Sequence, residues 1–122
     1  IPLFISKIQK GEKVPLYGDG SNIRDWLYVE DHCDAIWEVF TRAKTGSVYN
    51  VGGNNEYTNL EITKILLELC ENELTDIFVP DRPGHDKRYA IDATKIKNEL
   101  GWSPKVRFEE GIQRTINDYL GA

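Results

Sequence analysis

Short apolar runs alternate with amphipathic helical patterns along the chain, and this alternation restricts the fold more than any other feature. Apolar residues recur at helical spacing in five segments, at residues 1–11, 31–46, 58–70, 92–101 and 108–120. Short runs of extended character lie between them, at residues 14–17, 23–29, 47–51, 77–79 and 89–91. Short strands that alternate with helices predict the α/β class.

Several of the expected helices carry their own start and stop signals. Glu30 and Asp31 place negative charge where the second helix should begin. Thr58 and Glu61 have the spacing of a capping box, and Gly101 follows the last apolar residue of the fourth helical segment.

Composition bounds the class of protein. The chain has 122 residues, of which 40% are hydrophobic, so it is one domain or part of one and can bury a core. Its net charge of −5 argues against general nucleic-acid binding, and no apolar stretch reaches membrane-spanning length. Cys33 and Cys70 lie in apolar helical patterns, so we expect them to be buried thiols in a reducing cytoplasm. We expect Trp37 in the core as well.

The start of the chain points to a longer protein. Ile1 and Pro2 open the chain inside a helical pattern, and the sequence contains no methionine. We therefore expect these residues to be a piece of a larger chain.

The stretch 15–32 carries the first candidate site. Gly18 and Asn22 belong to a dense turn, after which Arg24 and Asp25 interrupt an aromatic and β-branched run. A fork-shaped guanidinium at this point suits a phosphate or a carboxylate ligand. The alternative is an Arg24–Asp25 pair that braces the loop, and this stretch alone favours that alternative.

Two further stretches could bind an anion. Arg82, His85 and neighbouring cations gather around a sharp turn at 83–84 in an otherwise acidic protein. The alternative is a solvated loop whose charges pair with Asp81 and Asp86. Asn59 lies at an expected helix N-terminus, where backbone N–H groups favour an anion. The alternative, which a single cap residue favours, is that Thr58 or Asn59 simply caps the helix.

Other chemistries lack their motifs. The two histidines, His32 and His85, are not near a cysteine at metal-ligand spacing, so no metal site is expected. The sequence contains no nucleophile elbow or P-loop. The pair Gly52 and Gly53 lacks the third glycine of a dinucleotide-binding fingerprint.

Five blocks together identify a family resemblance. They are PLYG at 15–18, RDWLYVEDH at 24–32, YNVGG at 49–53, RPGHDKRYAID at 82–92 and LGW at 100–102. In this order they resemble the C-terminal part of the dTDP-glucose 4,6-dehydratase family, which are extended short-chain dehydrogenases/reductases. The second and last blocks are shared with nucleotide-sugar epimerases, whereas the block at 82–92 is similar to the dehydratases in particular.

The resemblance implies a fold and a set of site residues. The chain would be the C-terminal substrate-binding part, residues 1–122, of a Rossmann-type enzyme whose NAD-binding half is absent. By position, Pro15 and Tyr17 would line the nucleobase pocket, and Arg24 and Arg82 would hold the diphosphate. The two remaining substrate-binding positions, Asn59 and His85, would contact the phosphate or sugar region and the nucleotide wall.

The resemblance also implies which parts of the chemistry lie elsewhere. The Gly-rich NAD loop, the YxxxK pair and the acidic dehydration residues would precede Ile1, so we expect no catalytic residue and no bound NAD on this chain. The parent would be an NAD-dependent lyase acting on dTDP-glucose, usually a homodimer. A related epimerase or decarboxylase is the alternative within the enzymes, and a non-catalytic binding module is the alternative outside them.

The isolated piece is expected to associate with itself. The segment 31–43 carries Ile36, Trp37, Val39 and Phe40, which form a wider apolar surface than one narrow stripe. The resemblance implies that this portion packs on the nucleotide-binding half, so its apolar surface would be open in the isolated chain.

Overall fold

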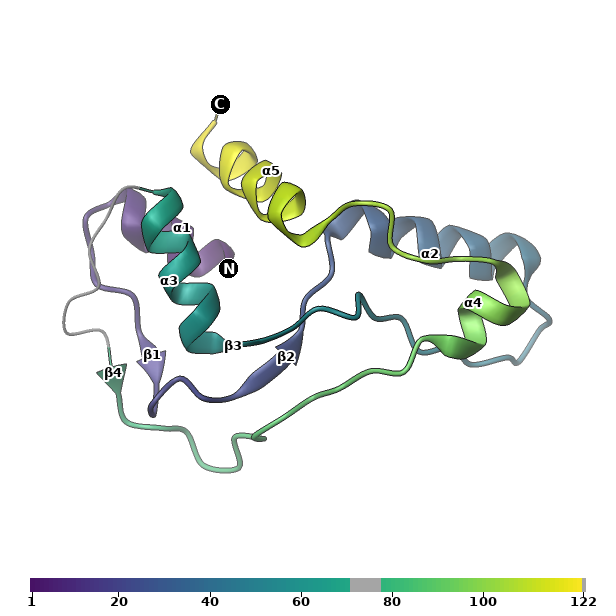
Figure 1. The fold of residues 1–122 in the computed structure, drawn as a ribbon, viewed down its shortest axis with the longest axis horizontal. Helices are drawn as coiled ribbons and strands as arrows, with labels where there is room; N and C mark the ends of the chain where they lie inside the picture. Colours follow the sequence, from purple (N-terminus) through teal and green to yellow (C-terminus); the bar gives the residue numbers. More distant parts are fainter. Residues whose placement is uncertain (71–77, 122) are drawn as a thin grey trace.

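The computed structural model describes residues 1–70 and 78–121. In those residues it has helices α1 Pro2–Gln9, α2 Val29–Arg42, α3 Asn59–Leu69, α4 Thr94–Leu100 and α5 Phe108–Leu120, and strands β1 Leu16–Tyr17, β2 Ile23–Asp25, β3 Glu56–Thr58 and β4 Phe78–Val79. The predicted α/β mixture is confirmed (Figure 1). No helix in the described ranges is long and apolar enough to span a membrane.

The strands form two small ladders. β1 pairs in parallel with β4, and β2 pairs antiparallel with β3. The second edge of β2 is used by the loop that follows β4, because Ile23 N donates to the Lys87 carbonyl at 2.8 Å and Tyr89 N donates to the Ile23 carbonyl at 3.0 Å. This loop, residues 80–92, is therefore held against the strand that carries Arg24.

The core is divided between the two ends of the molecule. Helices α1, α3 and α5 gather at one end in Figure 1, where Ile5, Leu66 and Ile116 are fully or almost fully buried. At the other end α2 and α4 pack around Ala35 and Ile96. Burial of each large aliphatic side chain contributes about 1.5–3 kcal/mol, so each end has its own stabilising cluster, and the loops and β2 run between them.

The predicted helix caps are present. Thr58 Oγ1 accepts from Glu61 N at 3.0 Å while the Glu61 carboxylate accepts from Thr58 N at 2.9 Å, which is the reciprocal capping box. Gly101 ends α4 in the left-handed conformation, with φ of 70°. Asp31, only 3% exposed in the first turn of α2, accepts from Val106 N at 3.0 Å and so ties α2 to the segment before α5.

One face of α2 is uncovered, contrary to the prediction for Cys33 and Trp37. Cys33 is exposed, Trp37 is 63% exposed and Phe40 is 81% exposed. The helix buries Ala35 against the α4 cluster, and that cluster covers only one side of it. The prediction that Cys33 and Trp37 are buried was therefore wrong for the described chain, although the apolar pattern that suggested it is real.

The strand predicted at 47–51 is also absent. None of its residues joins a ladder among the described residues, and side chains make the contacts instead: Lys95 Nζ donates to the Val48 carbonyl at 2.8 Å, and Tyr49 Oη donates to Glu99 at 3.0 Å. A strand needs a neighbouring strand to hydrogen-bond with, and the residue types within 47–51 do not reveal whether such a neighbour exists. The strand predicted at 77–79 is confirmed for Phe78–Val79, and Ile77 lies outside the described residues.

Candidate functional site

Arg24 lies in the middle of β2 and is oriented by neutral groups. Its Nη1 donates to the Ile23 carbonyl at 2.7 Å and its Nη2 to the Asp86 carbonyl at 3.1 Å. The guanidinium carbon also lies 4.4 Å from the centre of the Tyr89 ring, a cation–π distance. In the part of the chain that the structure describes, no ion pair joins Arg24 to a carboxylate, so its positive charge is held in place without being neutralised.

The Arg24–Asp25 pair favoured by that stretch alone is wrong. Successive side chains of a strand point to opposite faces. Asp25 accordingly turns to the other side and accepts from the backbone N–H groups of Gly53, Asn54 and Asn55 at 3.2, 3.3 and 3.0 Å. Asp25 therefore anchors the 53–55 turn and leaves Arg24 available.

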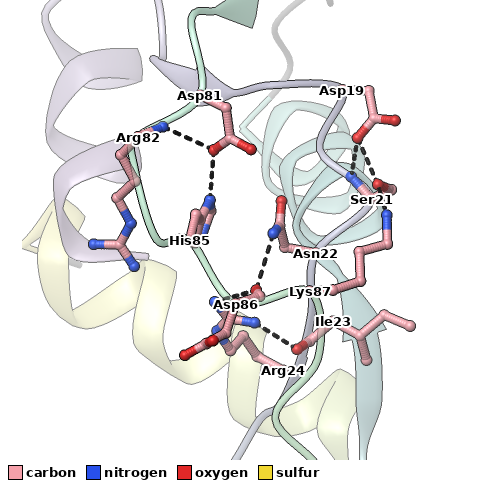
Figure 2. Close-up of polar contacts among 10 residues, drawn as sticks. All are labelled: Asp19, Ser21, Asn22, Ile23, Arg24, Asp81, Arg82, His85, Asp86 and Lys87. Atoms are coloured by element: carbon pink, nitrogen blue, oxygen red, sulfur yellow. Dashed lines mark hydrogen bonds and ion pairs between the residues drawn. The ribbon is translucent and has the colours of Figure 1, made fainter.

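The loop after β4 presents Arg82 and His85. Asp81 Oδ1 accepts from Arg82 N at 2.9 Å and lies 2.7 Å from Nδ1 of His85, whose side chain is 4% exposed. The hydrogen bond with His85 is the main reason that the pKa of Asp81 lies below its ordinary value. The alternative of a loop whose charges pair internally thus holds for His85. Figure 2 shows the Arg82 side chain projecting away from Asp81.

Two cations of this loop, Lys87 and Arg88, contact other protein side chains. Lys87 donates to Ser21 Oγ, and Arg88 forms an ion pair with Glu56 at 2.6 Å. Within residues 1–70 and 78–121, the Arg82 guanidinium hydrogen-bonds to no protein acceptor. A hydrogen bond to Asp86 raises the pKa of Tyr89. The positive charges of Arg24 and Arg82 both act against this shift, so both arginines influence the same Tyr89 hydroxyl.

Pro15, Tyr17 and Asn59 meet in one cleft. The cleft has a volume of about 180 Å³, and its wall is mostly apolar; it is lined by Ile1, Leu3, Phe4, Pro15, Leu16, Tyr17, Trp26, Asn59, Ile62, Thr63 and Leu66. An apolar wall with a few polar groups is typical of small-molecule sites. The expected helix cap is provided by Thr58, so the Asn59 side chain is not needed as the cap.

The cleft and the cationic loop are neighbours. The Tyr17 and His85 rings form an edge-to-face pair with centroids 6.0 Å apart. Gly18 N donates to the Val79 carbonyl at 2.9 Å, which holds the turn after β1 beside the start of the loop. The structure therefore brings Pro15, Tyr17 and Asn59 together and joins them through His85 to the loop that carries Arg82, while Arg24 lies on the strand at the loop's far edge.

The sequence did not single out the residues that orient these side chains. Asp81 and Asp86 were considered only as partners that would neutralise charge, yet Asp81 orients His85 and the Asp86 carbonyl orients Arg24. Asn22 was counted only as a turn residue, and it is 5% exposed. A turn asparagine gives no local sequence signal for a partner 64 residues away, so only the folded chain reveals this role.

The two glycines at 52–53 are explained by protein contacts. A Cβ at Gly53 would lie 2.4 Å from the Trp26 carbonyl oxygen, and one at Gly52 would lie 2.6 Å from Asp25 Oδ2. These glycines let two segments of the protein approach closely.

Comparisons with known proteins give one consistent result. The model of the family described as GDP-mannose 4,6 dehydratase matches residues 1–115. A dTDP-glucose 4,6-dehydratase from Xanthomonas campestris pv. campestris is 48% identical over 130 residues, which cover 98% of this chain and 37% of the relative. A dTDP-glucose 4,6-dehydratase from Actinoplanes sp. is 50% identical over 120 residues. The chain thus spans under two fifths of the length of the curated relatives it matches.

Solved structures agree with this result. The dTDP-glucose 4,6-dehydratase from Streptomyces venezuelae, determined with NAD and TYD bound, superposes with a TM-score of 0.95 at 43% identity, over 99% of this chain and 38% of the other. The UDP-glucose 4-epimerase from Thermotoga maritima, determined with UDP-glucose, gives 0.89 at 32% identity, over 98% and 38%. The chain is more similar in sequence to this dehydratase than to this epimerase.

Proposed function

Because the chain belongs to the GDP-mannose 4,6-dehydratase family, we propose that it is the nucleotide-sugar-binding portion of a dTDP-glucose 4,6-dehydratase. Residues 1–122 form the C-terminal part in this proposal, and the complete enzyme converts dTDP-glucose to dTDP-4-keto-6-deoxyglucose. The relatives that carry this name and cover 98% of this chain support the dehydratase over the related epimerases and decarboxylases.

The observation that carries the proposal is the pair of arginines beside an apolar cleft. Arg24 is held by the Asp86 carbonyl and the Tyr89 ring, and Arg82 has a guanidinium with no protein acceptor among the described residues. Two uncompensated guanidiniums suit the two phosphates of a nucleoside diphosphate, because the planar fork matches phosphate oxygens in a bidentate geometry.

The remaining residues complete the nucleotide site. Pro15 and the exposed ring of Tyr17 provide a rigid apolar surface for a flat base, and Asn59 adds one amide to the cleft wall. His85, oriented by Asp81 and in edge contact with Tyr17, borders the nucleotide between the base and the diphosphate. In this proposal these residues bind and orient the substrate.

NAD supplies the hydride chemistry of such an enzyme, and we propose that another part of the enzyme holds it. The glycine pair at 52–53 serves close approach of protein segments, so we assign no NAD contact to residues 1–122. In the same proposal the proton transfers of the reaction belong to groups outside this chain, and this chain determines which nucleotide is bound and where its sugar lies.

Turnover by a full-length enzyme that contains these 122 residues tests the proposal. With dTDP-glucose, the expected product is the 4-keto-6-deoxy sugar, identified by mass spectrometry and NMR. Interconversion of two nucleotide sugars without loss of water would replace the dehydratase with an epimerase. Binding of dTDP-glucose without turnover would replace it with a non-catalytic binding module. The 122-residue chain alone, given NAD and dTDP-glucose, should form no product.

A further inference from the structure

Asn22 lies where the segments that carry the candidate site residues meet. It occupies the turn between β1 and β2, and it is 5% exposed. Its side-chain Nδ2 donates to the Asp86 carbonyl at 3.0 Å, across 64 residues of sequence (Figure 2). Its own carbonyl accepts from Asn59 N at 2.9 Å, at the start of α3. One residue thus connects the strand of Arg24, the loop of Arg82 and the helix of Asn59.

The acceptor that Asn22 uses is the one that orients Arg24. The Asp86 carbonyl accepts from Asn22 Nδ2 at 3.0 Å and from Arg24 Nη2 at 3.1 Å. A carbonyl oxygen has two lone pairs, so it can accept both bonds at once. Asn22 therefore determines where the carbonyl lies, and the carbonyl determines where one side of the guanidinium lies.

The burial of Asn22 makes its contact with Asp86 energetically important. A buried polar group without a partner costs free energy, so the amide of a residue that is 5% exposed strongly favours the loop position in which Asp86 meets it. An ordinary turn asparagine would be exposed and would hydrogen-bond its own turn. The turn here has that local function supplied by Asp19, which accepts from Ser21 N at 2.9 Å. Asn22 is free to serve the long-range contact.

We propose that Asn22 is a positioning residue for diphosphate binding: its side-chain amide holds the Asp86 carbonyl, and that carbonyl holds the Arg24 guanidinium. This inference rests on the proposed function. Asn22 itself touches the protein and not the ligand, so its effect passes through Arg24.

The test compares dTDP with thymidine in a full-length enzyme that contains these residues. Asn22→Leu keeps the approximate side-chain size and removes the donor, and Asn22→Asp keeps the shape and places an acceptor against a carbonyl. We expect each variant to weaken dTDP roughly tenfold, the effect of about one charge-assisted hydrogen bond, and to leave thymidine affinity nearly constant. In turnover, KM for dTDP-glucose should rise more than kcat falls. The exposed Asn98→Leu is the matched control.

A double-mutant cycle identifies the route of the effect. In an Arg24→Ala background, Asn22→Leu should cause little further loss of dTDP affinity, because the group that it positions is gone. A full second loss, equal weakening of dTDP and thymidine, or wild-type dTDP affinity in the Asn22 variants would overturn the inference. If Asn22→Leu fails to fold, Asn22→Asp decides by the same criteria.

The outcomes also separate this inference from the proposed function. An unmodified enzyme that does not bind dTDP contradicts the proposed function. An enzyme that binds dTDP and is weakened by Arg24→Ala, but not by either Asn22 variant, contradicts only the positioning role.

Discussion

Asp25 is predicted to stabilise the fold through the 53–55 turn. Its carboxylate accepts from Gly53 N and Asn55 N through Oδ1, at 3.2 and 3.0 Å, and from Asn54 N through Oδ2 at 3.3 Å. These distances are longer than those of the strongest charge-assisted bonds, so each bond is assigned about 1 kcal/mol. Asp25→Ala removes three bonds and should lower the free energy of unfolding by about 3 kcal/mol.

The amide variant separates the contributions of the two oxygens. Asp25→Asn keeps Oδ1 and replaces Oδ2, so it retains the bonds to Gly53 and Asn55 and loses the one to Asn54. It should cost about 1 kcal/mol, near one third of the alanine effect. The difference in unfolding free energy between the two variants therefore follows from which oxygen of Asp25 accepts each hydrogen bond.

Urea denaturation of the purified chain, followed by tryptophan fluorescence, measures both changes. Trp26, one of three tryptophans, is next to Asp25, and its N donates to the Asn55 carbonyl at 2.9 Å, so unfolding of the turn changes its surroundings. The exposed Asp34→Ala is the control for removal of a carboxylate. Asp25→Ala within about 0.5 kcal/mol of that control, the usual range of surface substitutions, would refute the anchoring role.

Three further predictions concern other parts of the structure. Gly53→Ala should destabilise the chain by more than about 2 kcal/mol in urea, because its Cβ would lie 2.4 Å from the Trp26 carbonyl oxygen; an unchanged midpoint would contradict that close approach. The pKa of Asp81 is lowered in the fold, so the stability that its carboxylate adds is present above its ordinary pKa of 3.8 and is lost as the pH falls below that value. Asp81→Asn should therefore be less stable than the original chain in urea at neutral pH, and the difference in unfolding free energy should disappear in acid. A difference that stays constant with pH would contradict this contribution of Asp81. The isolated chain should self-associate through α2, and Trp37→Glu should shift light scattering at micromolar concentration toward monomer; a monomer before substitution would refute this.

Local signals in the sequence were sufficient to predict most of the helices. The reciprocal cap of Thr58 and Glu61 and the left-handed Gly101 each depend on residues within one helical turn, so spacing alone reveals them. The strand expected at 47–51 failed for the opposite reason, because a ladder needs a neighbour that is distant in sequence. Trp37 is exposed for a similar reason. Its helical spacing is a local property of the sequence, whereas its burial depends on which distant segments pack against α2.

The candidate site divides in the same way. The motif resemblance selected Arg24 and Arg82, and among the described residues neither guanidinium forms an ion pair with a carboxylate. The residues that orient Arg24 could not be predicted from the sequence, because Asn22 meets Asp86 only in the folded chain. The stretch around Arg24 alone favoured Asp25 as its partner, whereas Asp25 contacts the 53–55 turn on the opposite face of β2, since side chains alternate along a strand.

The affinity of an Arg82→Ala variant tests the central claim most directly. In a full-length enzyme that contains these residues, the loss of a guanidinium that faces a diphosphate should weaken dTDP-glucose roughly tenfold to hundredfold and leave thymidine nearly unchanged. Arg24→Lys should also weaken dTDP-glucose, because a point charge does not replace a bidentate fork. The exposed Arg107→Ala controls for the loss of one positive charge. Equal weakening of dTDP-glucose and thymidine by Arg82→Ala, or no weakening of either, would contradict the assignment of this loop to the diphosphate.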